Sequence, residues 1–210
     1  MIRNETIEGF LARLASKAPT PGGGGAGALS GAVGCALGRM VAQLTIGRKK
    51  YAEAEETMIR LDERLGELQE SFLSLADRDE EVFGRFMEAL GLPKESEEEK
   101  TVRKEAVEIA REEATEVPLS VMEKAVLAMP DVLTLAQIGN RNAVSDAGAA
   151  AHMLFSALKT GAENVRINLV SQKSEERKRS YESRMEALLT EGGELTEEII
   201  RTVRTRVEGA

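Results

Sequence analysis

The chain has 210 residues, 42% of them hydrophobic, which is enough to bury the core of one large domain. Its 36 acidic and 28 basic residues give a net charge of −8, which argues against a general nucleic-acid surface but permits a local basic site. One cysteine, Cys35, and one histidine, His152, exclude a disulfide within the chain and metal sites built from several thiolates or histidines.

The amino terminus, MIRNETIEGF, lacks the basic-then-apolar order of a signal peptide, so we expect a cytoplasmic protein. Apolar spacing predicts a short first helix from Ile7 to Leu14, capped by Asn4 and ending before Pro19. Residues 18–38 form an uncharged stretch of membrane-spanning length. Its few large apolar side chains and its glycine-rich start argue against a membrane span.

The stretch PTPGGGG, at residues 19–25, is predicted to be a loop, and a helix rich in small residues follows from Ala26 to about Ile46. Glycines four residues apart, as at Gly27 and Gly31, each cost roughly 1 kcal/mol in a helix interior. They also form flat faces that another helix backbone can approach closely. We therefore expect this helix to be central and tightly packed.

A basic run, TIGRKKY, ends that helix with Arg48, Lys49 and Lys50. A glycine loop before a helix exposes backbone N–H groups where the helix dipole favours negative charge. We interpret the loop and the basic run together as a site for an anionic ligand. Each feature alone is weak, because glycine loops often only turn and basic triplets usually face water.

Apolar residues at alternating steps of three and four predict one long helix from about Ala52 to Leu90. Asp79 occupies a position of this seam where its neighbours are apolar. Two interpretations stay open: the seam ends locally and Asp79 is solvated beside Arg78, or Asp79 is a partly buried acid with a shifted pKa and a function.

Ser96 and Glu99 form a capping box that opens a charged helix through about Glu116, which Pro118 is expected to interrupt. A further helix is predicted up to Pro130. No strand pattern is present. We predict an all-α protein, an up-and-down-like bundle with a long central helix and two small-residue helices. It forms a single domain over residues 1–210, with a C-terminal helical segment at 172–210.

The second informative region is GNRNAVSDAGAAAHMLFSALKTGAENVRINL. Ser145 is predicted to cap a helix whose first turn holds Asp146. One stripe of that helix runs from Asp146 past small residues to Asn164 and Asn168. Each polar group alone is explained by capping or helix bridging. Together with Asn140 and Asn142 they supply more directional hydrogen-bonding groups than packing requires, whereas His152 lies off the stripe.

These stretches, with LASKAPTPGGGGAGALSGAVG, LTIGRKKY, DRDEEVF and EVPLSVMEKA, resemble the cyclodeaminase/cyclohydrolase family, most strongly over residues 5–170. The resemblance implies an all-helical folate enzyme that forms a homodimer or a higher homo-oligomer, with its active site in a cleft between helices or subunits. Two positions depart from the family pattern. Gly25 stands where the family loop commonly has serine, and His152 stands where the family usually has an aliphatic residue.

The resemblance implies conversion of 5-formiminotetrahydrofolate to 5,10-methenyltetrahydrofolate with release of ammonia. The alternative is a methenyltetrahydrofolate cyclohydrolase, which forms 10-formyltetrahydrofolate, and a non-catalytic folate-binding or scaffold protein is the third interpretation. We expect a tetrahydrofolate derivative as substrate and no tightly bound cofactor, metal, nucleic acid or membrane. Asp79 and Asp146 are the predicted acid/base and cation-stabilising residues. The predicted substrate-binding residues are Gly22, Gly23, Gly24, Arg48, Lys49, Lys50, Asn140, Asn142, Ser145, Asn164 and Asn168.

Overall fold

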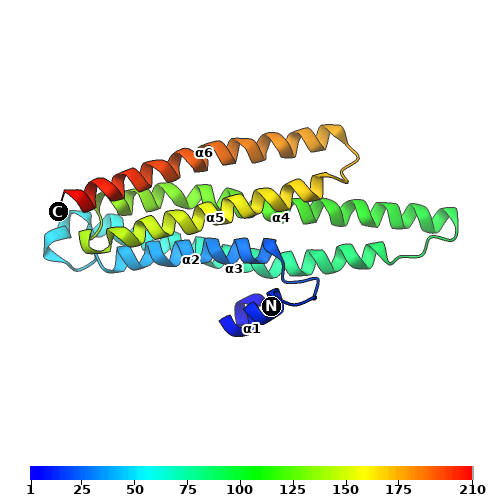
Figure 1. The fold of residues 1–210 in the computed structure, drawn as a ribbon, viewed down its shortest axis with the longest axis horizontal. Coiled ribbons are helices and arrows are strands. Elements are labelled where there is room, and N and C mark those ends of the chain that lie inside the picture. Colours follow the sequence, from blue (N-terminus) through cyan, green and yellow to red (C-terminus); the bar gives the residue numbers. More distant parts are fainter. Residues whose placement is uncertain (210) are drawn as a thin grey trace.

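Five long helices lie lengthwise beside one another, and a short N-terminal helix stands off their side (Figure 1). In the computed structural model, which describes residues 1–209, every regular element is helical. The elements are η1 (Ile2–Asn4), α1 (Ile7–Leu14), α2 (Gly23–Gln43), η2 (Lys49–Ala54), α3 (Glu55–Leu90), α4 (Glu97–Ile138), η3 (Arg141–Ala143), α5 (Val144–Leu169) and α6 (Glu175–Glu208). The predicted all-α bundle is confirmed.

Helix α2 packs against α3, α4 and α5, and its glycines make this close packing possible. A Cβ atom on Gly31 would lie 2.6 Å from Cδ1 of Phe72, and one on Gly34 would lie 2.9 Å from Cγ of Leu154. The predicted flat faces therefore meet neighbouring helices. By length and composition α2 also resembles a membrane span, with 56% of its most apolar window buried inside the bundle.

Helix α3 carries the predicted apolar seam, and Met58, Leu65 and Phe72 from it are fully buried. The helix begins at Glu55 rather than near Ala52, because η2 precedes it and Tyr51 has non-helical backbone angles. The seam thus forms the inner face of α3 against α2 and α4.

Helix α4 runs without interruption through Pro118 and Pro130, so the predicted break at Pro118 is wrong. Proline has no N–H to donate to the carbonyl four residues earlier, which here belongs to Ala114. The Nδ2 atom of Asn168, on α5, donates to this carbonyl oxygen at 2.7 Å. A side chain from the neighbouring helix thereby replaces the missing backbone hydrogen bond.

Two predicted caps are also wrong. Thr6 rather than Asn4 caps α1, because its Oγ1 accepts a hydrogen bond from the N–H of Gly9 at 3.0 Å. Ser145 does not cap α5, since Ala143 is the N-cap residue and Ser145 lies in the first turn. Each predicted cap was off by only two residues, a displacement that spacing alone does not resolve.

Ion pairs tie the N-terminal segment to α3. Arg13 pairs with both Glu5 and Glu80, and Nε of Arg3 lies 2.7 Å from Oδ2 of the buried Asp77. These contacts hold α1 and the loop that follows it beside the middle of α3, where Asp79 is found.

Cys35 lies fully buried on α2, in the centre of the bundle. Burial raises the pKa of its thiol to about 12, and the negative charge of Asp131 acts in the same direction. Asp131 is itself buried on α4, with Oδ2 3.2 Å from Nε of Arg64. Cys35 is therefore a protonated, apolar packing residue.

Candidate active site

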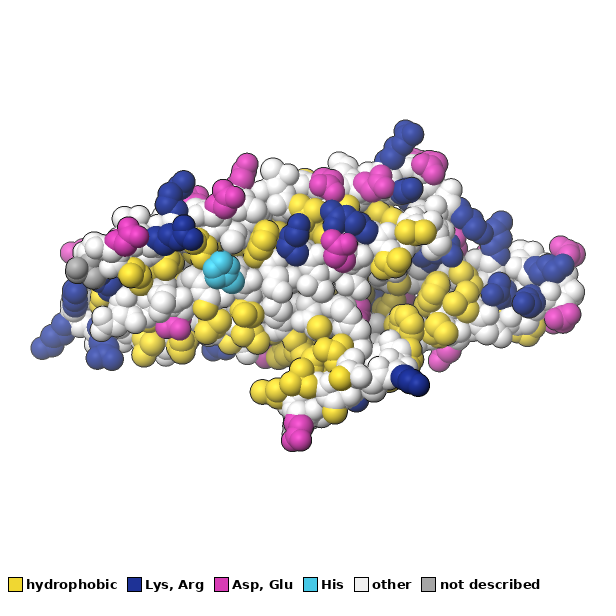
Figure 2. Space-filling view, in the orientation of Figure 1, with side chains coloured by type: hydrophobic (Ala, Val, Ile, Leu, Met, Phe, Trp, Pro, Cys, Tyr) yellow, Lys and Arg dark blue, Asp and Glu magenta, His cyan; other side chains and the backbone are white. Residues whose placement is uncertain are grey.

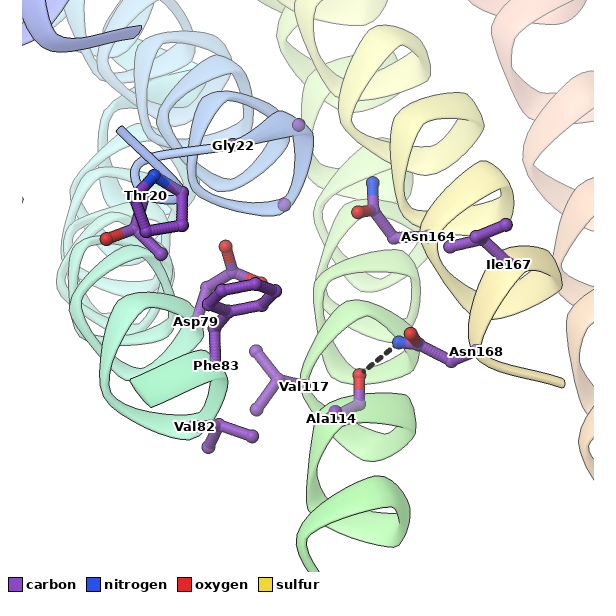
Figure 3. A pocket seen from close by; sticks show the side chains of 13 residues that line it. Thr20, Gly22, Asp79, Val82, Phe83, Ala114, Val117, Asn164, Ile167 and Asn168 are labelled. Carbon is purple, nitrogen blue, oxygen red and sulfur yellow. Dashed lines mark hydrogen bonds between the residues drawn. The ribbon is translucent and has the colours of Figure 1, made fainter. Parts of the chain in front are cut away.

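A cavity of about 270 Å³ opens where the first turn of α2 meets α3, α4 and α5 (Figure 3). The loop before α2 closes one side of it. Its lining residues are Pro19, Thr20, Gly22, Gly23, Gly24, Asp79, Val82, Phe83, Ala114, Val117, Asn164, Ile167 and Asn168.

Asp79 projects from α3 into the first turn of α2. A Cβ atom on Gly24 would lie 2.6 Å from Cγ of Asp79, so glycine at this position makes room for the carboxyl group. The N-cap residue Gly22 has no side chain with which to cap the helix, and the Asp79 carboxyl group faces the open N–H of Gly25. Sequence spacing identified Asp79, and the structure explains why glycines surround it.

Burial raises the pKa of Asp79 above its ordinary value. The hydrogen bond from the backbone N–H of Gly25 acts in the opposite direction, and the negative charge of Glu80 adds to the increase. Of the two interpretations of Asp79, the half-buried acid with a shifted pKa is therefore the one that the structure favours. A carboxyl group of this kind exchanges protons closer to neutral pH than a solvated aspartate does.

Two amide side chains of α5 face Asp79 across the cavity (Figure 3). Nδ2 of Asn164 donates to the carbonyl of Thr160 at 2.8 Å, and Nδ2 of Asn168 donates to Ala114. These bonds fix both side chains and do not use their Oδ1 atoms. The cavity thus combines one carboxyl group, two held amides and exposed helix-terminal backbone.

The apolar part of the cavity wall was not identified from the sequence. Val82 and Phe83 follow Asp79 by three and four positions, and Ile167 follows Asn164 by three. Residues at these spacings share a helix face, so the periodicity around each polar residue was the signal that pointed to them. They give the cavity a surface suited to the flat, apolar face of a ligand ring.

The other predicted site residues lie at the opposite end of α2. The length of α2 separates them from the cavity. Its 21 residues rise about 1.5 Å each, which gives about 30 Å. We call this group the basic end; its members are Arg48, Lys49, Lys50, Asn140, Asn142, Ser145 and Asp146. Within one chain the predicted site residues therefore lie in two groups, one at the cavity and one at the basic end.

Within the basic end, Asn140 has a clear structural task. Its backbone N–H donates to Oγ1 of Thr45 and its Nδ2 to the carbonyl of Leu44, both at 2.8 Å. Its Oδ1 accepts from the backbone of Asn142 at 3.1 Å. Asn140 thus ties the start of α5 to the end of α2, while the three basic side chains are exposed.

The whole chain is similar to a known family, to curated relatives and to a solved structure. Residues 6–187 match the family model described as formiminotransferase-cyclodeaminase. A methenyltetrahydrofolate cyclohydrolase of Methylorubrum extorquens is 41% identical over 99% of this chain and 100% of its own length. A mouse formimidoyltransferase-cyclodeaminase is 30% identical over 97% of this chain, which spans 38% of that relative. The crystal structure of a formiminotetrahydrofolate cyclodeaminase from Thermotoga maritima, 30% identical, superposes with a TM-score of 0.81 over 100% of this chain and 98% of that one.

Proposed function

The chain belongs to the formiminotransferase-cyclodeaminase family, and from that premise we propose that it is a methenyltetrahydrofolate cyclohydrolase. It is an enzyme of folate one-carbon chemistry. Both activities act on a one-carbon unit, which bridges N5 and N10 in the substrate of the hydrolysis and is carried by N5 alone in the substrate of the deamination. Of the two activities expected from the sequence, we place the hydrolysis first and the deamination second.

The 41% identity to a cyclohydrolase, which extends over nearly all of both chains, carries this proposal. The similarity to the mouse relative is lower, and it involves only 38% of that longer protein. The cavity itself is compatible with either reaction, because both need a proton-transferring group and oriented polar groups rather than a nucleophilic side chain.

In the hydrolysis, water adds to the cationic carbon that joins N5 and N10. Ionised Asp79 accepts a proton from that water, which leaves a neutral tetrahedral carbon bearing a hydroxyl group. The bond from this carbon to N5 then breaks, and Asp79 returns its proton to N5. The hydroxyl proton leaves to solvent as the formyl carbonyl forms on N10. Before the attack, the same carboxylate stabilises the substrate cation.

The remaining cavity residues position the substrate. The Oδ1 atoms of Asn164 and Asn168 are acceptors for the N–H groups of a pterin ring, and their orientation is fixed by the hydrogen bonds of their Nδ2 atoms. Phe83 and Ile167 provide apolar surface for the faces of the ring. Such fixed placement lowers the entropic cost of reaching the transition state.

The second candidate function is the cyclodeaminase, which the full-length superposition on the Thermotoga maritima enzyme favours. In that reaction N10 adds to the carbon of the protonated formimino group, and ionised Asp79 accepts the proton that N10 loses. Asp79 would then donate this proton to the NH2 group on the tetrahedral carbon, so that the C–NH2 bond breaks, ammonia leaves and the methenyl cation remains.

Assays with both folates decide between the two activities. Purified protein is mixed with 5,10-methenyltetrahydrofolate or with 5-formiminotetrahydrofolate, and the methenyl absorbance and ammonia release are followed. We expect loss of methenyl absorbance faster than the uncatalysed hydrolysis, and no ammonia. Ammonia release from the formimino substrate at a higher kcat/KM than the hydrolysis would establish the cyclodeaminase instead.

A further inference from the structure

A cluster of polar side chains joins α1 to α3 next to Asp79. Arg13, in the last turn of α1, pairs with Glu5 and with Glu80. Glu80 directly follows Asp79 on α3. One guanidinium group therefore connects the N-terminal segment to the immediate neighbour of the acid in the cavity.

Thr20 connects this cluster to the cavity wall. It lines the cavity, and its Oγ1 donates to Oε1 of Glu80 at 3.3 Å. Its carbonyl oxygen lies 3.5 Å from Nη2 of Arg13, the nitrogen that also pairs with Glu80. Arg13 and Glu80 together thus hold the segment that closes the cavity just before the glycine turn.

Apolar packing gives α1 only a limited attachment to the bundle. Figure 2 shows this segment projecting below the bundle, with hydrophobic side chains on its visible surface. Ile7 and Leu11 are exposed, and among the described residues of α1 only Phe10 is buried. Because so little of the helix is buried, the ion pairs of Arg13 have a large share in fixing its position.

The same ion pair bears on the charge of Asp79. Burial raises the pKa of Asp79 most, and the negative charge of Glu80 adds to the increase. The guanidinium group of Arg13 meets that negative charge directly, and the hydrogen bond to Glu80 raises the pKa of Arg13. Without Arg13, the charge of Glu80 would act on Asp79 uncompensated and favour its protonated form.

The elements packed around Asp79 bring few other charges. Among residues 1–209 Asp79 is the only charged side chain that lines the cavity. On α3 itself, Asp77 pairs with Arg3, and Arg78 lines a separate groove. The acids of α4 in that groove each pair with an arginine; they are Glu112, Glu113 and Glu116. Of all these charges, that of Glu80 is the one that acts on the pKa of Asp79.

From these contacts we propose that Arg13 is a positioning residue: it offsets the charge of Glu80, which keeps Asp79 available as a proton acceptor, and it holds Thr20 in the cavity wall. The use of Asp79 as a proton acceptor rests on the proposed function, whereas the electrostatic action of Arg13 on Asp79 does not. Glu80→Gln is the opposite change to Arg13→Gln, because Glu5 still holds Arg13 when the charge of Glu80 is removed.

The titration of the Asp79 carboxyl group tests this proposal without an assay of activity. Carbon-13 NMR of protein labelled at its aspartate carboxyl carbons follows each acid, and Asp79→Asn identifies the signal of Asp79. In Arg13→Gln the acid should titrate about 0.3–1 pH unit higher than in wild type, as for one charge about 10 Å away at dielectric constants between about 80 and about 20. In Glu80→Gln it should titrate lower than in wild type.

Two further variants separate charge from structure. Arg13→Lys keeps the positive charge, so its titration should stay near that of wild type. The double variant Arg13→Gln, Glu80→Gln loses both charges and should also titrate near wild type. Arg60→Gln breaks an exposed ion pair with Glu56 on the same α3, about five turns from Asp79, and is the control for the loss of an arginine. Circular dichroism verifies that each variant folds.

An unchanged titration in Arg13→Gln, or shifts of the same direction in Arg13→Gln and Glu80→Gln, would overturn the proposal. The pH dependence of kcat/KM for the hydrolysis should follow the NMR titration. On the rising limb of that profile Arg13→Gln should then be about two- to tenfold slower than wild type. A uniform loss of kcat at every pH, without a shifted titration, would make Arg13 a purely structural residue. Titrations that shift as expected while kcat/KM does not follow them would instead refute ionised Asp79 as the base of the proposed function.

Discussion

At the residue scale, the position of Asp79 leads to opposite expectations for activity and for stability. Burial keeps its native pKa above the value in the unfolded chain. The protonated form therefore stabilises the native state at acid pH, and this stabilisation is lost as the pH rises through the native pKa. A neutral side chain at this position does not ionise, so it does not lose this stabilisation as the pH rises. It also cannot accept a proton from the attacking water.

Asp79→Asn should lower turnover at least about tenfold, equivalent to about 1.4 kcal/mol of transition-state stabilisation. Its free energy of unfolding should gain relative to wild type as the pH increases from 4 toward neutral, because only the wild-type side chain ionises. Urea unfolding across this pH range, with kcat measured in parallel, checks both effects. Glu81→Gln, exposed on the same helix, is the control. Normal turnover of Asp79→Asn would show that Asp79 only caps α2 and has no part in catalysis.

Gly24 and Gly84 form a pair that tests the geometry around this acid. A methyl group on Gly24 would collide with the Asp79 carboxyl group, while one on Gly84, exposed on α3 outside the cavity, would meet no atom within 4 Å. Gly24→Ala should therefore displace Asp79 and reduce turnover, and Gly84→Ala should leave turnover close to wild type. Steady-state kinetics and circular dichroism separate a displaced acid from a misfolded chain. Equal activities for the two variants would contradict the placement of Asp79.

At the element scale, the paths of the helices could largely be predicted, because periodicity and small-residue spacing record which faces are buried. The break expected at Pro118 is an exception whose cause lies outside the helix. Pro118 was expected to end a helix by the local rule, yet α4 continues because Asn168 lies 50 positions further along the chain and satisfies the freed carbonyl of Ala114. Contacts between distant segments leave no trace in a local pattern.

This compensation predicts a thermodynamic coupling. Asn168→Ala should cost about 1–3 kcal/mol of stability, because the Ala114 carbonyl is left without its partner. Pro118→Ala restores a backbone N–H to α4, so the double variant should lose less than Asn168→Ala alone, provided that alanine fits. A double-mutant cycle from urea unfolding measures this coupling. Strict additivity of the two changes would show that the hydrogen bond to Ala114 carries no stability.

At the scale of the whole molecule, the candidate site was predicted only in part. The residue types were identified from their chemistry, and Asp79, Asn164, Asn168 and the glycine loop do meet at one cavity. The basic end does not join them, because neither composition nor spacing shows which end of a helix bundle a loop reaches. The roles assigned to Asp146 and to the three cations stay predictions.

The basic end predicts an electrostatic contribution to substrate affinity. Replacing Arg48, Lys49 and Lys50 with serine should raise KM, most for a polyglutamylated folate, and leave kcat nearly unchanged, because a remote anchor stabilises ground and transition states alike. The wild-type KM should also rise with salt, and that of the variant should respond less. Kinetics at two ionic strengths with mono- and polyglutamylated substrate check this. An unaltered KM would mean that the three basic residues only face solvent and do not bind the substrate.

Because Cys35 is buried, its reaction with a thiol reagent reports how often the native bundle opens. The thiol lies at the centre of the packing of α2 and has a pKa of about 12, so a thiol reagent reacts with it only during moments when the bundle opens. The reaction rate at low reagent concentration then reports the free energy of opening, and its plateau at high concentration reports the opening rate. A folate that closes the cavity should slow this labelling. A constant rate on addition of folate would mean that the ligand and the opening of α2 are independent.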